Sequence, residues 1–240
     1  MLVRASEAIA GGAASDRLVQ IVAEFSTQIR NPRFPCFFAA RALAEDEILF
    51  GLAESSPDLP GAITELMREA SRAIRSSSKL VVAIFADVAF DATLAQEREF
   101  AGQVLRRLRQ EDRVPWPPDA PQDPRDPRWV FWFEGVDFFI NFSSPGHKCR
   151  RSRNLGSAFS MVVQSRSSFD DFGLHSKARE IVRSRLAGYD DLPPHPALGV
   201  YGDSANREIL QYFLGDTNTD SWELLNLEPS ELPHHDLGGR

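Results

Sequence analysis

Six residues with basic or amide side chains gather directly after an apolar stretch of the chain. They are His147, Lys148, Arg150, Arg151, Arg153 and Asn154. The segment Ser143-Ser144-Pro145-Gly146 precedes them and interrupts any strand that reaches it. Packing alone gives little reason to gather such donors in one loop, whereas binding residues concentrate on loops held by a rigid scaffold. We therefore expect a binding site here, in which the cationic side chains hold an anionic group through charge-assisted hydrogen bonds.

His147 is the candidate metal ligand of this loop. Neutral imidazole is the commonest metal ligand among side chains, and it also binds heme iron. Neighbouring cations lower the pKa of an imidazole and keep it neutral, as ligation requires. The competing interpretation is a surface-loop histidine without a chemical role.

Two other residues offer alternative ligands. His195 lies between Pro194 and Pro196, which fix the direction of its backbone, so it is a second ligand, a catalytic proton carrier or an ordinary turn residue. Cys36 is either a small buried hydrophobe or a thiolate ligand of heme. Cys36, Cys149 and the two histidines could instead form a zinc site, although the paired CxxC spacing typical of zinc sites is absent.

Three acids, Glu134, Asp137 and Glu208, are expected near this site. A buried carboxylate there would suit a guanidinium or amine substrate, because the two groups form paired hydrogen bonds. We name Glu134 and Glu208, together with His195, as the candidate catalytic residues. The ordinary interpretation of the acids is charge on a hairpin or on a helix surface.

Five strands are expected to position these residues. Apolar, aromatic and β-branched patterns predict them over residues 47–53, 80–86, 129–133, 136–142 and 157–163. Glu134-Gly135 is a two-residue hairpin signal between the third and fourth strands. The fifth strand would extend this hairpin into a meander with the His147 loop at one end.

Helical spacing of apolar residues predicts helices over residues 18–29, 63–74, 92–110 and 176–186. Asp203 is expected to cap a further helix that carries Ile209, Leu210 and Phe213. Residues 111–128 contain six prolines and are expected to form an ordered loop, and residues 216–240 a tail that is poorly ordered at its end. Together the elements predict one α+β domain over residues 1–240, with a mixed or antiparallel sheet of about five strands and flanking helices.

Composition narrows the class of protein. The chain has 240 residues, of which 42 % are hydrophobic and 25 % charged, as in globular proteins. A net charge of −7 argues against nucleic acid as the partner of the HKCRRSR segment, since phosphate binding is largely electrostatic. Two cysteines, no membrane-length apolar stretch and no apparent export signal predict a cytoplasmic protein without a membrane partner. Motifs of Rossmann, P-loop, serine-hydrolase and zincin enzymes are missing.

Three segments of the sequence resemble the YqcI/YcgG family. They are Phe34-Pro35-Cys36, FINFSSPGHKCRRSRNLG at residues 139–156 and PPHPALGVYGDSANREILQYFL at residues 193–214. The resemblance extends over roughly residues 30–215. This family includes heme-dependent N-hydroxylases of guanidino compounds that act in natural-product biosynthesis. Where its members often carry a basic residue after Lys148, this chain has Cys149.

The resemblance implies a heme b cofactor. His147 becomes the first candidate for the axial ligand, His195 the second and Cys36 the third. The candidates for contacts with heme propionates or a substrate carboxylate are Lys148, Arg150, Arg151, Arg153 and Asn154. The cofactor supplies the oxidising power, and the protein orients the substrate and excludes water.

The implied reaction is O₂-dependent N-hydroxylation of arginine or an arginine-derived compound. A separate reductase would supply the electrons, and a homodimer is compatible with this interpretation. The alternative function is a heme carrier or sensor, which would bind heme without turning over arginine.

Overall fold

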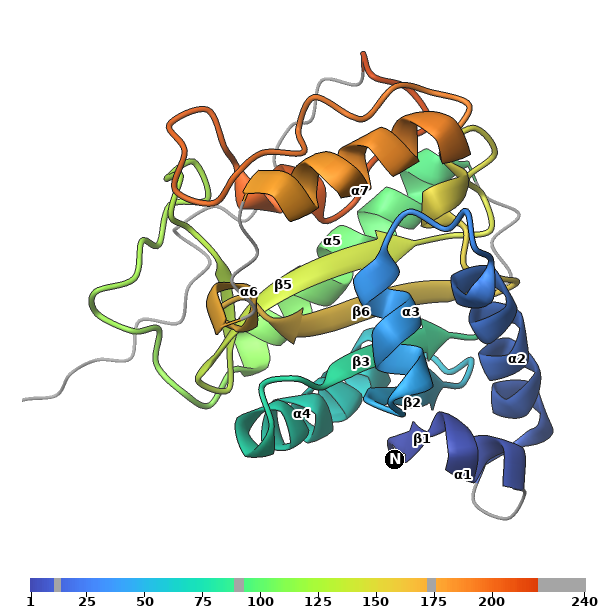
Figure 1. Ribbon diagram of the computed structural model, residues 1–240. Helices are drawn as coiled ribbons and strands as arrows, with labels where there is room; N and C mark the ends of the chain where they lie inside the picture. The colour runs from blue at the N-terminus through green and yellow to red at the C-terminus, as the bar shows by residue number, and fades with distance from the viewer. Residues whose placement is uncertain (11–13, 89–92, 172–175, 220–240) are drawn as a thin grey trace, which may run out of the picture.

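The computed structural model in Figure 1 contains one mixed sheet of six strands with helices on both faces. It describes residues 1–10, 14–88, 93–171 and 176–219. The strands are β1 (Val3–Arg4), β2 (Ile48–Ala53), β3 (Val81–Ala86), β4 (Phe131–Phe133), β5 (Val136–Ser143) and β6 (Phe159–Ser165). The helices are α1 (Ala5–Ala10), α2 (Asp16–Arg30), α3 (Phe37–Ala44), α4 (Leu59–Ser76), α5 (Leu94–Glu111), α6 (Ser168–Asp171) and α7 (Ser176–Tyr189), with 3₁₀ turns η1 (Arg151–Arg153) and η2 (Glu208–Gln211).

The strand order is β1-β2-β3-β6-β5-β4. Strands β2 and β3 are parallel, because α4 crosses between them, and all other neighbours are antiparallel. The predicted α+β class is confirmed, and each of the five predicted strands is present. The sixth strand, β1, was missed because two residues are too short to show an alternating pattern.

Two apolar cores hold the helices against the sheet. On one face, α4 and α5 bury Met67 and Leu105 against strand residues such as Ile140. On the other face, Phe25 of α2 packs edge-on against Phe50 of β2, with ring centroids 5.4 Å apart. Figure 1 shows α2 and α3 in front of the sheet and α5 behind it. Every helix in the described part of the chain is too short or too polar to cross a membrane.

The prediction of a helix that begins at Asp203 and carries Ile209, Leu210 and Phe213 is wrong. Only the four residues of η2 are helical, and the Asp203 side chain accepts from Ala205 N–H in a turn before them. Long-range hydrogen bonds explain the difference, since Phe142 N–H donates to Tyr212 O over 2.7 Å and the Tyr212 hydroxyl donates to Phe138 O over 2.9 Å. These bonds tie the segment to β5 and end the helical turn.

The remaining segments to compare with the sequence predictions are short helices, the proline-rich loop and the tail. Helices α1 and α3 were not predicted, and α3 begins directly after Cys36. Residues 112–130 contain neither helix nor strand. The expected disorder at the end of the tail concerns residues 220–240, which lie outside the described residues.

Candidate functional site

The loop of residues 143–156 holds the chain's own segment 211–218. His147 lies at its centre and is 1 % exposed. Its Nε2 is 2.7 Å from Leu214 O, and its Nδ1 is 3.3 Å from Ser144 O. Burial lowers the pKa of His147, so the ring is neutral and carries one N–H. The shorter contact indicates that Nε2 donates to Leu214.

Asp216 is the second contact between the loop and this segment. Its carboxylate accepts three backbone N–H groups, from Lys148 over 2.6 Å, Cys149 over 3.0 Å and Arg150 over 2.8 Å. Burial raises the pKa of Asp216, but these N–H groups outweigh burial and leave the pKa below its usual value. The loop therefore binds a carboxylate, and that carboxylate belongs to the same chain.

Two buried guanidinium groups make the remaining contacts with this segment. Arg150, 1 % exposed, donates from Nε to Gly215 O over 2.7 Å and from Nη2 to Asn218 Oδ1 over 2.7 Å. Arg153, 5 % exposed, donates from Nη2 to Gln211 O and from Nη1 to Tyr212 O, at 3.0 and 3.2 Å. Burial, with Arg150 nearby, lowers the pKa of Arg153 to about 9.

The other predicted donors of the loop also have partners within the chain. Lys148 is exposed and donates to Pro145 O, and Asn154 donates to the carbonyl oxygens of Pro145 and His147. Arg151 is exposed and pairs with Asp191 at 3.0 Å. The expectation that packing gives little reason to gather these residues is wrong, because the side chains of His147, Arg150 and Arg153 fasten segment 211–218. Contact with heme propionates stays a prediction, and it would require several of these bonds to be exchanged.

His195 lies in a turn that packs beside the same segment. The Ala197 N–H donates to His195 Nδ1 over 3.0 Å, so a neutral ring carries its hydrogen on Nε2. A Cβ atom on Gly199 would come within 2.2 Å of Asn206 Oδ1, and this close approach requires glycine. Asn206 Oδ1 also accepts from Gln211 Nε2 over 2.8 Å, which links the His195 turn to the segment that the loop holds.

Glu208 is part of this cluster. It is 3 % exposed, and its Oε2 lies 3.5 Å from Asn206 Nδ2 and 3.4 Å from Gln211 Nε2. The structure therefore brings Glu208, His195 and the loop of residues 143–156 into one region. Their proposed chemical roles stay predictions.

Glu134 and Cys36 lie elsewhere. Glu134 occupies the tight turn between β4 and β5, at the opposite end of β5 from the loop, and its carboxylate is 3.4 Å from Arg68 Nε. Cys36 precedes α3 and is partly exposed, and burial raises the pKa of its thiol. No three His, Cys, Asp or Glu residues gather as a metal site in the described ranges, so those ranges do not assemble the zinc site considered as an alternative.

One face of the sheet near α7 is incompletely covered. Asp137, Phe139 and Asn141 of β5 alternate with buried residues and are only partly buried, as are Val162 and Gln164 of β6. These five residues share one face, because Phe139 is opposite Gln164 and Asn141 opposite Val162 in the register. We call them the β5–β6 face.

Helix α7 lies on this side of the sheet. Arg185 of α7 donates to Pro32 O in the turn between α2 and α3, and Tyr189 packs edge-on against Phe34. None of the described residues of α7 is buried, and Ile181 is 44 % exposed. A helix with an exposed isoleucine and a sheet face with partly buried apolar residues provide surface suited to an apolar ligand. The alternation of polar and aromatic residues in β5, which predicted the strand, could also have indicated this face.

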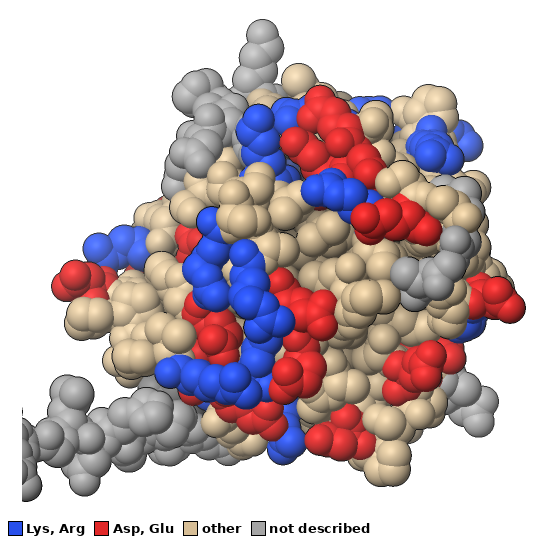
Figure 2. All heavy atoms as spheres, turned by 90° about the horizontal axis from the view of Figure 1, so that it is seen from below, with Lys and Arg blue, Asp and Glu red and all other residues tan. Residues whose placement is uncertain are grey.

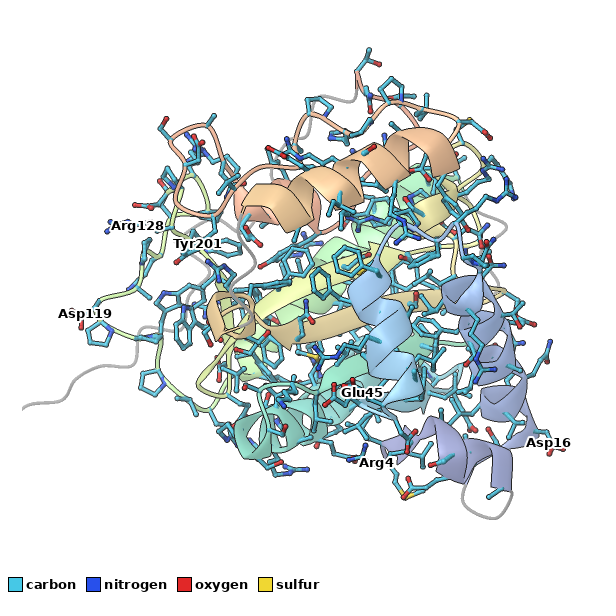
Figure 3. The ribbon with its side chains drawn as sticks, viewed as in Figure 1. Arg4, Asp16, Glu45, Asp119, Arg128 and Tyr201 are labelled. Atoms are coloured by element: carbon cyan, nitrogen blue, oxygen red, sulfur yellow. The ribbon has the colours of Figure 1, made fainter. Side chains whose placement is uncertain are left out.

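Tyr201 borders this region and connects it to the proline-rich loop. The Arg166 guanidinium lies 3.9 Å from the Tyr201 ring centroid, and the Tyr201 hydroxyl donates to Arg128 O over 2.8 Å. Figure 3 shows Tyr201 beside Arg128. Gly202 N–H also donates to Pro127 O. Residues 201–202 are therefore fastened to the loop that precedes β4.

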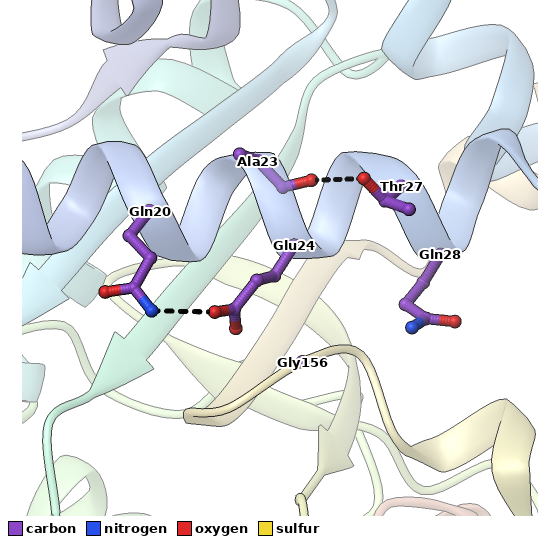
Figure 4. Close-up of a pocket in the computed structure, with 6 residues that line it drawn as sticks. All are labelled: Gln20, Ala23, Glu24, Thr27, Gln28 and Gly156. Carbon is purple, nitrogen blue, oxygen red and sulfur yellow. Dashed lines mark hydrogen bonds between the residues drawn. The ribbon is translucent and has the colours of Figure 1, made fainter.

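A shallow groove of about 470 Å³ lies along α2 (Figure 4). It is lined by Gln20, Ala23, Glu24, Thr27, Gln28 and Gly156. Gln20 donates to Glu24 over 2.9 Å, and Glu24 also accepts from Ser157 N–H over 2.8 Å. Its main charged group is thus already bonded within the chain, and none of the predicted site residues lines it.

Charged side chains on the face seen in Figure 2 form no broad basic patch, because blue and red residues alternate across it. This mixture, like the net charge of −7, gives that face little attraction for a polyanion.

Glu97 of α5 is a buried carboxylate beneath the loop. It is 2 % exposed, and its Oε2 has no hydrogen-bond partner in the described part of the chain. A Cβ atom on Gly146 would lie 2.6 Å from this oxygen, so the loop packs closely on the carboxyl group. Burial raises the pKa of Glu97, which means that the folded state favours the protonated form.

Replacing Glu97 with glutamine should raise the free energy of unfolding at neutral pH. Because its pKa is raised, Glu97 binds a proton more tightly in the folded wild type than in the unfolded chain. Wild-type stability therefore falls as pH rises from the ordinary pKa of 4.5 through the folded pKa. Glutamine removes this dependence. Urea unfolding between pH 4 and pH 8 measures how the free energy of unfolding depends on pH. Glu99→Gln, at an exposed position on the same helix, is the control. Equal pH slopes for Glu97→Gln and wild type would contradict the expectation.

Comparison with known proteins adds a family assignment. The sequence model of the YqcI/YcgG family matches residues 25–224. A Streptomyces lavendulae protein, DcsA, is 34 % identical over 209 residues, which cover 82 % of this chain and 78 % of DcsA. Its name gives it the provisional assignment of N(omega)-hydroxy-L-arginine synthase.

Two uncharacterized proteins of Bacillus subtilis (strain 168) are also similar. YcgG is 35 % identical over 196 residues, with 76 % of each chain covered. YqcI is 29 % identical over 197 residues, with 77 % of this chain and 76 % of YqcI covered. No solved structure matches this chain.

Proposed function

This chain belongs to the YqcI/YcgG family, and from that premise we propose that it N-hydroxylates the guanidino group of arginine or an arginine-derived compound. The observation that carries the proposal is the 34 % identity with DcsA over most of both chains. The resemblance of residues 139–156 and 193–214 to the family supports it, because the structure packs these two segments against each other.

We further propose heme as the cofactor and O₂ as the oxidant. When bound, heme supplies the oxidising power for the reaction. The stoichiometry requires two electrons and two protons from an external donor. One oxygen atom then ends on the substrate nitrogen and the other leaves as water. A separate reductase or a reduced small molecule is therefore part of the proposal, as is a cytoplasmic setting, in which both cysteines are free thiols.

The contacts of the three candidate ligands bear on which of them would hold the iron. In His147 both ring nitrogens face carbonyl oxygens, and in His195 the lone pair of Nδ1 accepts from Ala197 N–H. Either histidine would have to give up a backbone contact, or change its tautomer, before it could bind a metal. The Cys36 sulfur accepts from the backbone N–H groups of Phe38 and Ala39, and these contacts would favour the thiolate, which is the form of a thiol that binds a metal. The structure therefore favours Cys36 over the two histidines.

The surroundings of Cys36 are compatible with a flat apolar group. Phe37 and Phe38 follow it, both partly exposed, with ring centroids 4.1 Å apart. The described residues of α7 and the β5–β6 face add further incompletely covered surface on the same side of the sheet. These residues would exclude water from a bound cofactor and substrate.

Polar side chains of the protein would orient the substrate and accept its proton. A protonated guanidinium is a poor nucleophile, so a carboxylate must orient it and accept a proton. Glu208 is a buried carboxylate near the His195 turn, and the two remain the candidates for proton transfer. Glu134 is ion-paired with Arg68 and would have to leave that pair to act.

An absorbance spectrum and a mass measurement test the proposal. Protein expressed with adequate iron should show a heme band that shifts on reduction under CO. Arginine incubated with protein, reductant and O₂ should gain one oxygen atom. A colourless protein that does not take up hemin would refute heme use, and heme binding without arginine oxidation would identify a carrier or sensor instead.

Variants of the three ligand candidates identify the residue that holds the iron. Cys36→Ala should abolish the band of thiolate-ligated heme, whereas His147→Ala and His195→Ala should retain it. Retention of that band in Cys36→Ala would transfer the assignment to a histidine. Circular dichroism checks that each variant is folded, because His147 also holds Leu214.

A further inference from the structure

Asp137 is a carboxylate of the β5–β6 face whose hydrogen-bond donors in the described part of the chain are all neutral. It accepts from Ser165 Oγ over 2.7 Å, from Ser167 N–H over 2.8 Å and from Ser167 Oγ over 3.3 Å. The ion pairs found within the described residues include none with Asp137. Three donors thus fix the orientation of this carboxylate without neutralising its charge.

Glu134 and Glu208, the other two acids considered as partners of the substrate, differ from Asp137 because one is already ion-paired and the other is almost fully buried. Glu134 already pairs with the Arg68 guanidinium. Glu208 is 3 % exposed and lies between two side-chain amides. Asp137 is only partly buried, so a cation from solvent can reach it without breaking an ion pair.

Two neighbours of Asp137 suit a guanidinium. Trp132 of β4 is directly opposite Asp137 in the register, so the two side chains share a face and are close together. An indole ring attracts a cation placed over its face. Gln164 lies opposite Phe139, two positions along β5, and offers an amide oxygen.

We propose that Asp137, Trp132 and Gln164 form the subsite that receives the guanidinium of the substrate. The carboxylate accepts hydrogen bonds from the planar cation, the indole covers its face, and the Gln164 oxygen accepts a further hydrogen bond. This assignment rests on the proposed function and specifies which acid selects a cationic substrate over a neutral one.

Binding of arginine and of citrulline tests the subsite, because citrulline replaces the guanidinium with a neutral urea group of similar shape. Isothermal titration uses the full-length protein, with and without added hemin. Wild type should bind arginine more tightly than citrulline. Asp137→Asn should weaken arginine binding by about 10- to 100-fold, as expected for hydrogen bonds to a charged group. Citrulline binding should change little, so the preference for arginine disappears.

Two variants separate charge from structure. Ser165→Ala keeps the carboxylate but removes one orienting bond, and it should retain the arginine preference with a smaller loss of affinity. Asp87→Asn is a matched change at a carboxylate paired with Arg17, and it should leave both affinities unchanged. Thermal unfolding confirms that each variant is folded.

Several results would overturn the assignment. They are an unchanged arginine preference in Asp137→Asn, an equal loss of both ligands in a folded variant, and no arginine binding by wild type. If wild type oxidises arginine and Asp137→Asn keeps the preference, the subsite is wrong and the proposed function stands. If Asp137 controls arginine binding but no oxidised product forms, the subsite stands and the proposed reaction is wrong.

Discussion

Arg153→Met should lower the free energy of unfolding by about 3–5 kcal/mol, because it removes four hydrogen bonds of a buried guanidinium. The guanidinium donates to Gln211 O and Tyr212 O in one segment and to Phe142 O and Asn141 Oδ1 in β5. A buried acceptor that loses its partner costs about 1–3 kcal/mol, and methionine supplies no donor. Removing a desolvated charge offsets part of this loss. Urea unfolding followed by circular dichroism measures the difference.

Arg151→Met is the matched control for this prediction. Arg151 is two positions away, 53 % exposed in its side chain, and pairs with the exposed Asp191. Exposed ion pairs contribute about 0–1 kcal/mol, so this variant should unfold close to wild type. If Arg153→Met is no less stable than Arg151→Met, Arg153 does not hold the two segments together, and it would become available for ligand binding.

Asp216→Asn should lower the free energy of unfolding by about 1.5–3 kcal/mol, the usual contribution of hydrogen bonds to a charged group. Three backbone N–H groups point at the carboxylate, and an asparagine side chain would turn its own N–H groups toward some of them. Asp191→Asn, at an exposed carboxylate with 59 % side-chain exposure, is the control. Chemical denaturation at pH 7 measures both variants.

The pH dependence of the Asp216 contribution follows from the direction of its pKa shift. The folded pKa lies below the ordinary value of 3.8, so the folded state binds fewer protons than the unfolded chain as the pH falls. The contribution is therefore complete above pH 3.8 and is lost as pH falls through the folded pKa. The difference between wild type and Asp216→Asn should shrink in that acidic range. A constant difference would show that the negative charge is not what stabilises the contact.

His147 affects a different pH range. Burial lowers its pKa below the ordinary value of 6.5, so its neutral ring contributes fully above pH 6.5 and that contribution is lost as pH falls through the folded pKa. Wild type and Asp216→Asn both show this loss, and it is larger in Asp216→Asn because the Asp216 carboxylate raises the pKa of His147 against the effect of burial. Acid destabilisation that begins above the Asp216 range is therefore attributable to His147, and not to Asp216.

Local patterns predicted most of the fold. The alternating residues of β5, the β-branched run of β3 and the apolar stripe of α4 each specify an element through short-range periodicity. The segment after Asp203 resembled a helix by the same criterion, but Tyr212 bonds to β5 instead. Helical spacing reports local preference alone, and tertiary hydrogen bonds override it there.

The candidate site, like the fold, could be predicted from the sequence only in part. Residue types and order located the loop of residues 143–156, the PPHP turn and Cys36, together with the family they resemble. They could not show that His147 and Arg153 bind the chain's own carbonyl oxygens, because those partners are 67 and 58 residues away. They also favoured Glu134 over Asp137 as a candidate catalytic residue, whereas strand pairing places the two acids in different environments.

The sequence by itself determined the α+β class, the strands and main helices, and the family to which the chain belongs, because short-range pattern and ordered motifs are written in neighbouring residues. Only the tertiary structure decided which polar groups already have partners, and that Asp137 makes no ion pair with another described residue. The physical reason is that burial and hydrogen bonding depend on contacts between residues far apart in the chain.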